Sequence, residues 1–276
     1  MRSMNFRFFV IAAAIIGLTG CATAPSLQSA RPASANDRRI SLAKSETAAK
    51  TDHVTKHLNA DGSVIYSQNF GGGGVSLGLL LGPLGVAANM KMIDGVTSAD
   101  AVRLKGKLGL DPVRAFQEAA SITHFAIGTP ANQGDVTVTP YVLVSKTNES
   151  TVHISSVVLF EGVDDQKKWV KRYQYQLPGK YTLDELAALD ATQVSSVQTA
   201  SASAYALLLK HVAEESDATV SQERRIIFKS AYLSPRFEFE MAGSLIGERQ
   251  ERVWVRTMTG VAAVDAQDIQ YRITKN

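Results

Sequence analysis

Alternating apolar and polar residues in the middle of the chain predict three β-strands. Apolar side chains recur at alternate positions over residues 136–144, 152–160 and 169–177. This period of two is typical of strands that bury one face. Polar, turn-forming residues fill the two short gaps between these runs, so we expect an antiparallel β-meander with one wetter face.

A helical pattern follows the third predicted strand. Thr182 and Glu185 match a capping box. The apolar spacing after them predicts one long helix over residues 183–215. Earlier in the chain, Asp111 and Pro112 predict the start of a shorter helix, because Asp caps an N-terminus well and Pro fits the first turn.

Short strand-like runs return near the C-terminus, at residues 225–228, 236–240 and 252–256. We therefore predict an α+β fold in which the antiparallel β-meander packs on the long α-helix, followed by a small C-terminal β element. Residues 51–220 are expected to form the α+β domain, and residues 221–276 a C-terminal β-rich segment.

The N-terminus has the layout of a secretory signal. Arg2 and Arg7 give a basic start, and an uncharged apolar run follows. The run ends in Leu18-Thr19-Gly20-Cys21, which resembles the lipobox of bacterial lipoproteins. The resemblance implies that residues 1–20 are removed as a signal peptide. It also implies that Cys21 is the lipidation site, diacylated on its thiol and acylated on its new amino group.

The same resemblance implies a location. In lipoproteins of many Gram-negative bacteria, Asp directly after the cysteine marks retention in the inner membrane, and this chain has Ala22 there. We therefore expect a protein that is lipid-anchored in the outer membrane and faces the periplasm. Three acyl chains exceed the two hydrophobic signals that stable attachment requires.

Residues 21–50 have the composition of a tether. They are rich in Ala, Ser and Thr, contain Pro25 and Pro32, and hold few large apolar side chains. Such a segment cannot bury enough apolar surface to offset its ordering entropy. We expect a flexible tether after the lipidated N-terminus, with a mean reach of about 30 Å.

Charge and cysteine content exclude several classes of site. The formal net charge is +3, and it falls to +1 once Arg2 and Arg7 leave with the signal peptide. A near-neutral domain is not expected to bind nucleic acid. Cys21 is the single cysteine, so no disulfide forms within the chain. His53 and His57 lie four residues apart without an identifiable third ligand, and we expect no metal and no cofactor.

A glycine-rich apolar segment covers residues 70–88. A Gly-Pro pair interrupts it, and residues 75–88 would span only about 21 Å as a helix, against roughly 30 Å of bilayer hydrocarbon. A simple membrane span is therefore not expected, and a buried hairpin or short helix is favoured. Gly74, Gly78 and Gly82 would share a helical face, which makes them candidates for contact with a membrane, a partner or a second copy. An exposed loop is the remaining alternative.

The same segment matches the Gly-x-Ser-x-Gly elbow of serine hydrolases, with Ser76 at its centre. In those enzymes the serine sits on a tight turn between a strand and a helix. Asp184 or Asp190, and then His211, follow in the chain order of a catalytic triad. The rest of the chain lacks the alternating strands and helices of that fold, so a hydrolase using Ser76 is the less favoured alternative.

Trp169, Tyr173 and Tyr175 stand among basic residues and are compatible with a glycan-binding surface. Strand alternation explains them as core residues on one face, and we favour that interpretation. Taken together, the sequence predicts a non-catalytic accessory or binding component of an envelope assembly, transport or maintenance system. Its expected partners are the membrane, through acylated Cys21, and another envelope protein.

Overall fold

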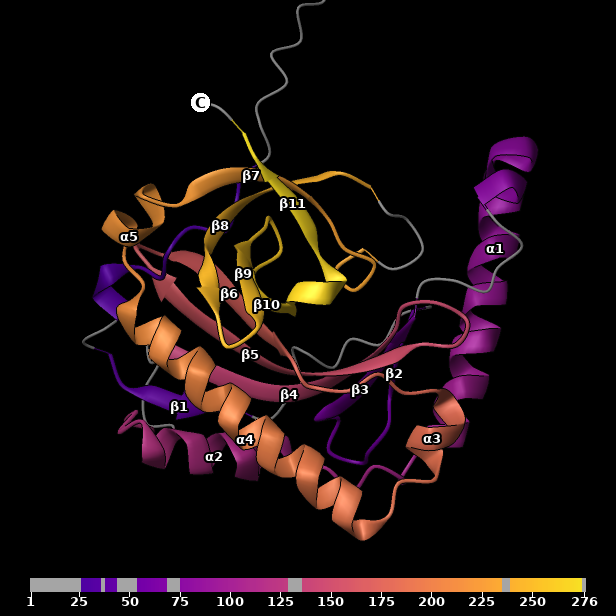
Figure 1. Cartoon of the computed structure of the whole chain (residues 1–276), viewed down its shortest axis with the longest axis horizontal. Helices are drawn as coiled ribbons and strands as arrows, with labels where there is room; N and C mark the ends of the chain where they lie inside the picture. The colour runs from indigo at the N-terminus through magenta and orange to yellow at the C-terminus, as the bar shows by residue number, and fades with distance from the viewer. Residues whose placement is uncertain are drawn as a thin grey trace, which may run out of the picture.

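The computed structural model describes residues 26–35, 38–43, 54–68, 75–128, 136–234 and 239–274. In these residues eleven strands form one mixed sheet, which helices cover in part (Figure 1). The strands are β1 (Ile40–Leu42), β2 (Thr55–His57), β3 (Val64–Gln68), β4 (Val136–Lys146), β5 (Val152–Asp164), β6 (Lys167–Gln176), β7 (Arg224–Lys229), β8 (Met241–Arg249), β9 (Arg252–Arg256), β10 (Val261–Asp265) and β11 (Gln270–Ile273). The α-helices are α1 (Val75–Leu104), α2 (Pro112–Ile122), α3 (Leu183–Ala187), α4 (Ala191–Glu214) and α5 (Asp217–Ser221).

The three long strands that the sequence predicted, β4, β5 and β6, lie side by side and antiparallel in the middle of the sheet. The full strand order is β11-β7-β8-β9-β10-β6-β5-β4-β3-β2, with β1 paired to β4 off this path. Both β1 and β3 run parallel to β4, and β10 runs parallel to β6. These parallel pairs join segments that are far apart in the sequence and turn the local meander into a larger sheet.

The predicted fold class, an antiparallel β-meander packed on one long α-helix with a small C-terminal β element, was therefore wrong. The C-terminal strands continue the central sheet, because β10 pairs with β6. The helix predicted over residues 183–215 is also divided, into α3 and α4. Asp190 and Gln193 form a second capping box, with each side chain bonded to the other's backbone N–H, and this box starts a new helix after α3 has ended.

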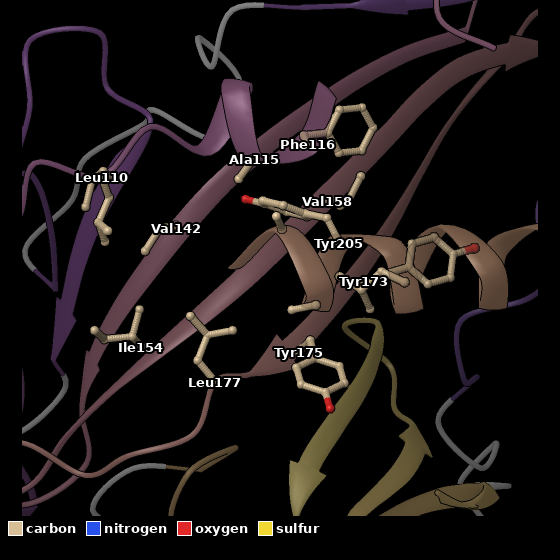
Figure 2. Close-up of a cluster of buried hydrophobic side chains, with 14 of the residues drawn as sticks. Leu110, Ala115, Phe116, Val142, Ile154, Val158, Tyr173, Tyr175, Leu177 and Tyr205 are labelled. Atoms are coloured by element: carbon tan, nitrogen blue, oxygen red, sulfur yellow. The ribbon is translucent and has the colours of Figure 1, made fainter. Parts of the chain in front are cut away.

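Helices α2 and α4 cover one face of the central strands, whereas β7 to β11 curl over the other face (Figure 1). Phe116 of α2 meets Tyr205 of α4 edge to face, with 5.6 Å between the ring centroids. The Tyr205 hydroxyl donates a 2.8 Å hydrogen bond to the carbonyl of Tyr141 in β4. Figure 2 shows Phe116 and Tyr205 close to Val158 of β5, and all three side chains are fully buried. This apolar cluster holds the helical layer on the sheet.

The start of α2 lies where the sequence predicted it. The Asp111 side chain accepts a 2.9 Å hydrogen bond from the backbone N–H of Arg114, and Pro112 occupies the first turn. The Gln198 amide of α4 then accepts from the Asp111 N–H at 3.0 Å and donates to its carbonyl at 2.8 Å. The cap of α2 is thus fixed to α4 as well as to its own helix.

Residues 26–35, which we call the strap, lie against the body of the protein. Ser34 donates a 2.6 Å hydrogen bond to Asp164 at the tip of the β5–β6 hairpin. Further along, β1 adds a short parallel strand to β4. The described residues 26–35 and 38–43 therefore differ from the flexible tether expected over residues 21–50, because backbone and side-chain hydrogen bonds tie them to the sheet.

Gly260 provides a test of the close contact between β10 and β6. Its φ is +151°, and a Cβ atom there would lie 2.6 Å from the carbonyl oxygen of Arg172. We expect Gly260→Ala to lower the free energy of unfolding by about 2–4 kcal/mol, because it adds backbone strain and a steric overlap. Urea unfolding of the purified protein measures this change.

The matched control is Gly95→Ala, on an exposed position of α1 where a Cβ atom meets nothing within 4 Å. There the substitution should be neutral or stabilise the protein by up to about 1 kcal/mol, because Ala favours helix. Equal effects at the two positions would contradict the assigned packing of β10 on β6.

Candidate functional site

The candidate site residues from the sequence fall into two groups. Cys21 and Gly74 lie outside the described residues. Gly78 and Gly82 lie in the first half of α1, and Ser76 is in its first turn. The expected hairpin or short helix is instead part of one 30-residue helix, about 45 Å long, that continues through the Gly-Pro pair.

Helix α1 packs on the body through its second half. The buried side chains recur every three or four residues, at Ile93, Thr97, Ala101 and Leu104, which is the spacing of one helical face. This half contacts β2, β3 and α3. Figure 1 shows the first half of α1 extending beyond the edge of the sheet.

A buried polar network fixes the base of α1. Asp100 accepts hydrogen bonds from the Tyr66 hydroxyl of β3 at 2.8 Å and from the Lys146 ammonium of β4 at 3.0 Å. Burial and the neighbouring carboxylate raise the pKa of Tyr66. The Gln68 amide also donates to the Thr97 hydroxyl at 3.1 Å. Because such groups are costly to bury without partners, this network strongly favours one position of the helix base.

Apolar side chains are exposed where α1 leaves the body. Ala87 and Ala88 are exposed, and Met90 and Met92 are 42% and 43% exposed. No charged residue occurs between Val75 and Met90. Among the described residues, no helix is both long enough and apolar enough to cross a membrane.

A second group of interacting residues lies where the strap meets the sheet. The Gln28 side chain accepts from the Arg172 N–H at 2.9 Å and donates to the Arg172 carbonyl at 3.3 Å. The Gln28 backbone N–H donates to the Thr257 carbonyl at 2.9 Å. Gln28 therefore bonds to β6 just beyond the point where β10 stops pairing with it, which is at Tyr173.

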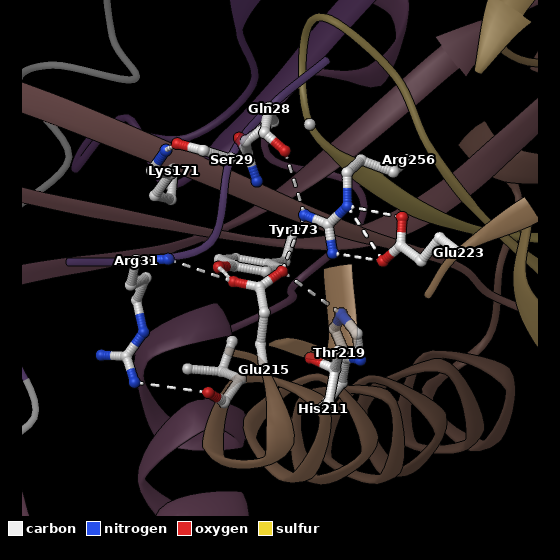
Figure 3. Close-up of polar contacts among 12 residues, drawn as sticks. Gln28, Ser29, Arg31, Lys171, Tyr173, His211, Glu215, Thr219, Glu223 and Arg256 are labelled. Atoms are coloured by element: carbon white, nitrogen blue, oxygen red, sulfur yellow. Dashed lines mark hydrogen bonds and ion pairs between the residues drawn. The ribbon is translucent and has the colours of Figure 1, made fainter. Parts of the chain in front are cut away.

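The strap also covers a buried ion-pair cluster built around Arg256 (Figure 3). The Arg256 guanidinium pairs with Glu215 through Nη1 at 2.8 Å and with Glu223 through Nη2 at 2.7 Å. It also donates to the backbone carbonyl of Gln28 at 3.2 Å. The side chains of Arg256, Glu215 and Glu223 are 1%, 1% and 7% exposed, so each charge depends on the others.

Glu215 receives further contacts from three directions. Its Oε2 accepts from the Tyr173 hydroxyl at 2.5 Å and from the Arg31 backbone N–H of the strap at 3.4 Å. Burial alone would raise the pKa of Glu215, but the nearby imidazole of His211, the Tyr173 hydroxyl and the Arg256 charge lower that pKa to about 2. Glu215 therefore stays ionised at neutral pH and cannot serve there as a general acid.

A pocket of about 420 Å³ opens beside this cluster. His211 and Glu215 line it at the end of α4, and Leu245, Gly247 and Arg249 line it from β8. Nη2 of Arg249 lies 3.4 Å from Nδ1 of His211. Nε2 lies 3.7 Å from Glu215 and makes no hydrogen bond within the described part of the chain.

Other residues that the sequence singled out have structural positions. His57 lies in strand β2 rather than on a helix, and His53 lies outside the described residues. In the described stretches, no three His, Cys, Asp or Glu side chains are grouped as a metal site requires. Tyr173 and Tyr175 point into the core, as strand alternation predicted, and are 0% and 8% exposed.

Sequence reasoning missed the strap residues Gln28 and Arg31 and the roles of Glu215, Glu223 and Arg256. Each is a common polar residue in an unremarkable setting, and the pairs are separated by up to 228 positions. Only Arg256 carried a local signal, because it alternates with aromatic Trp254 on a predicted strand.

Comparison with known proteins adds no relative: no family model, no curated protein and no solved structure matches this chain.

The low pKa of Glu215 predicts a pH-dependent stability. A folded pKa of about 2, below the usual 4.5, stabilises the fold above about pH 5, and this contribution is lost as the pH falls towards 2. Glu215→Gln should therefore cost about 3 kcal/mol at pH 6.5 and progressively less at lower pH. Urea unfolding of both proteins between pH 2.5 and 6.5 measures the difference.

Glu214→Gln provides the matched control. This neighbouring side chain is 53% exposed, and its carboxylate lies 3.7 Å from Arg249 in a long, solvent-exposed ion pair. It should change the free energy of unfolding by less than about 1 kcal/mol at either pH. Equal losses for the two variants at pH 6.5 would show that the buried ion pair is not what Glu215 contributes.

Proposed function

We propose that this protein is a lipid-anchored, non-catalytic binding component of the bacterial cell envelope, held in the outer membrane through Cys21 and facing the periplasm. On this proposal, α1 is the element that docks on a partner protein. The observation that carries the proposal is the projecting first half of α1, which holds no charged residue. Met90 and Met92 are exposed directly after it, where the helix reaches the body.

The lipobox resemblance at Leu18-Thr19-Gly20-Cys21 supports the membrane anchor. The strap supports it from the structural side, because Gln28 is fixed to the sheet only seven residues after Cys21. An anchor at that cysteine would hold the folded body near the membrane surface. The projecting helix would then be available to a partner in the envelope.

The positions of the acidic residues favour binding over hydrolysis at Ser76. Asp184 pairs with Arg103, and Asp190 caps α4 through its bond to the Gln193 N–H. His211 is buried beside Trp254, with 5.1 Å between the ring centroids. Each of the proposed triad partners is thus engaged in a structural contact of its own.

A second candidate function is self-association or membrane contact through α1. Gly78 and Gly82 are four residues apart on this helix, a spacing that allows close approach of two helices. The same projecting helix therefore serves both candidates, and an experiment on it must distinguish a partner protein, a second copy and lipid.

Lipidation is tested directly on Cys21. The protein expressed with its signal peptide should incorporate labelled palmitate and float with membranes. Cys21→Ser should remove the label, because the thiol that accepts the diacylglycerol is absent. Ala22→Ser is the matched control and should be labelled as the wild type is. Absence of label from the wild-type protein would remove the anchor from the proposal.

The docking role of α1 is tested by a photo-crosslinking amino acid at Met90 in the native envelope. We expect a discrete crosslinked product containing one envelope protein, identified by mass spectrometry. Val102 is the matched control position, because it is 75% exposed near the C-terminal end of the same helix, where α1 packs on the body.

The variant with both Gly78→Leu and Gly82→Leu should reduce the Met90 crosslink at least fivefold, while circular dichroism shows that the fold is kept. Crosslinks to a second copy or to lipid would favour the second candidate function. Equal crosslinking from Met90 and Val102 would contradict a specific docking role for α1.

A further inference from the structure

The strap limits which surface of the body can meet the membrane, provided that Cys21 is lipidated as proposed above. Gln28 lies seven positions after Cys21, and a fully extended chain of seven residues reaches about 25 Å. Gln28 is itself bonded to Arg172 of β6 and to Thr257 in the turn between β9 and β10. The bilayer surface must therefore lie within about 25 Å of this part of the sheet.

Exposed apolar side chains gather in that region. Of the nine large apolar side chains that are most exposed in the described residues, three are Val163, Val170 and Met258, at 41%, 52% and 59% exposure. Met258 follows Thr257, and Val170 lies two residues before Arg172, so both are next to direct partners of Gln28. Val163 pairs with Lys168 on the neighbouring strand, which places it on the same face as Val170.

Two exposed lysines lie next to these three residues. Lys167 and Lys168 are exposed at the start of β6. Asp164, across the turn, is engaged by Ser34 and by Arg38. Asp165 at the tip and Glu161, which pairs with Val170 across the two strands, add two negative charges. Exposed apolar side chains next to lysines are typical of surfaces that rest in the headgroup region of an anionic membrane.

We propose that Val163, Val170 and Met258, the anchor-side patch, contact the lipid headgroups when Cys21 is acylated. The inference rests on the proposed lipid anchor and adds to it the face of the protein that meets the membrane. The partner is a phospholipid surface. The position of this lipid surface on the protein follows from the length of chain between Cys21 and Gln28 and from the exposure of the patch.

The test uses the lipidated full-length protein in vesicles of phosphatidylethanolamine and phosphatidylglycerol at a 3:1 ratio. Because acylation consumes the single natural thiol, one introduced cysteine can be labelled selectively with a fluorophore. Val170→Cys and Met258→Cys report on the patch, and Val102→Cys is the exposed control on the far edge of the sheet. Nitroxide-labelled lipids quench a fluorophore that lies close to them.

We expect the probes at positions 170 and 258 to be quenched at least twofold more than the probe at position 102. Equal quenching at all three positions, in protein that floats with the vesicles, would overturn the inference and leave the lipid anchor intact. Failure of the wild-type protein to carry acyl chains would overturn the proposed anchor and this inference with it. Flotation of the Cys21→Ser protein beside the wild type separates these two results.

A strap variant tests whether the docked strap sets this orientation. Gln28→Ala combined with Arg31→Ala removes the bonds to Arg172 and to the Val212 carbonyl. With the strap released, the difference in quenching between positions 258 and 102 should fall by at least half, while the circular dichroism spectrum is retained. An unchanged difference would show that the strap does not orient the body. Surface-exposed Gln267→Ala is the control substitution.

Discussion

Burial of the Arg256 guanidinium is the constraint on which much of the arrangement depends. A charge that is 1% exposed requires partners of opposite charge, and breaking such a pair commonly costs several kcal/mol. Glu215 arrives from the end of α4, Glu223 from the residue before β7, and the Gln28 carbonyl from the strap. The charge therefore selects one relative position for the helical layer, the C-terminal strands and the N-terminal segment.

The strap supplies hydrogen bonds to one edge of β6 where no strand pairs with it. At Arg172, where β10 no longer pairs with β6, the Gln28 side chain bonds to both the N–H and the carbonyl of that residue. A side-chain amide has one donor group and one acceptor, so it can replace a neighbouring strand at one residue. Lys171 of β6 donates a hydrogen bond to the Ser29 hydroxyl of the strap, and burial lowers the pKa of this lysine.

Local patterns predicted the local elements, and the long-range pairings were out of their reach. Alternation identified β4 to β6, and Asp111 with Pro112 identified the start of α2, because these signals depend on near neighbours. The parallel pair of β10 and β6 depends on residues almost ninety positions apart, for example Val261 and Tyr173. No periodicity within either strand specifies such a partner.

The misjudged segments have a physical explanation. The second capping box at Asp190 was not identified in a pattern that otherwise looked continuous, so α3 and α4 were predicted as one helix. The strap has the composition of a disordered tether. It is ordered by polar bonds that Gln28 and Ser34 make to Arg172 and Asp164 of the sheet, and its composition does not reveal those partners. The candidate site was least predictable, since Arg256, Glu215 and Glu223 come from segments far apart in the sequence and meet through long-range packing.

The polar base of α1 has a mechanical consequence. About 27 Å of helix precedes Ile93, where burial begins. A rotation of about 10° at the base would move the far end of the helix by roughly 5 Å. Conversely, a sideways force at the N-terminal end of α1 produces a torque at its base. The bonds of Asp100 to Tyr66 and Lys146 resist that torque. The geometry thus makes the network at the base the mechanical link between the end of the helix and strands β3 and β4.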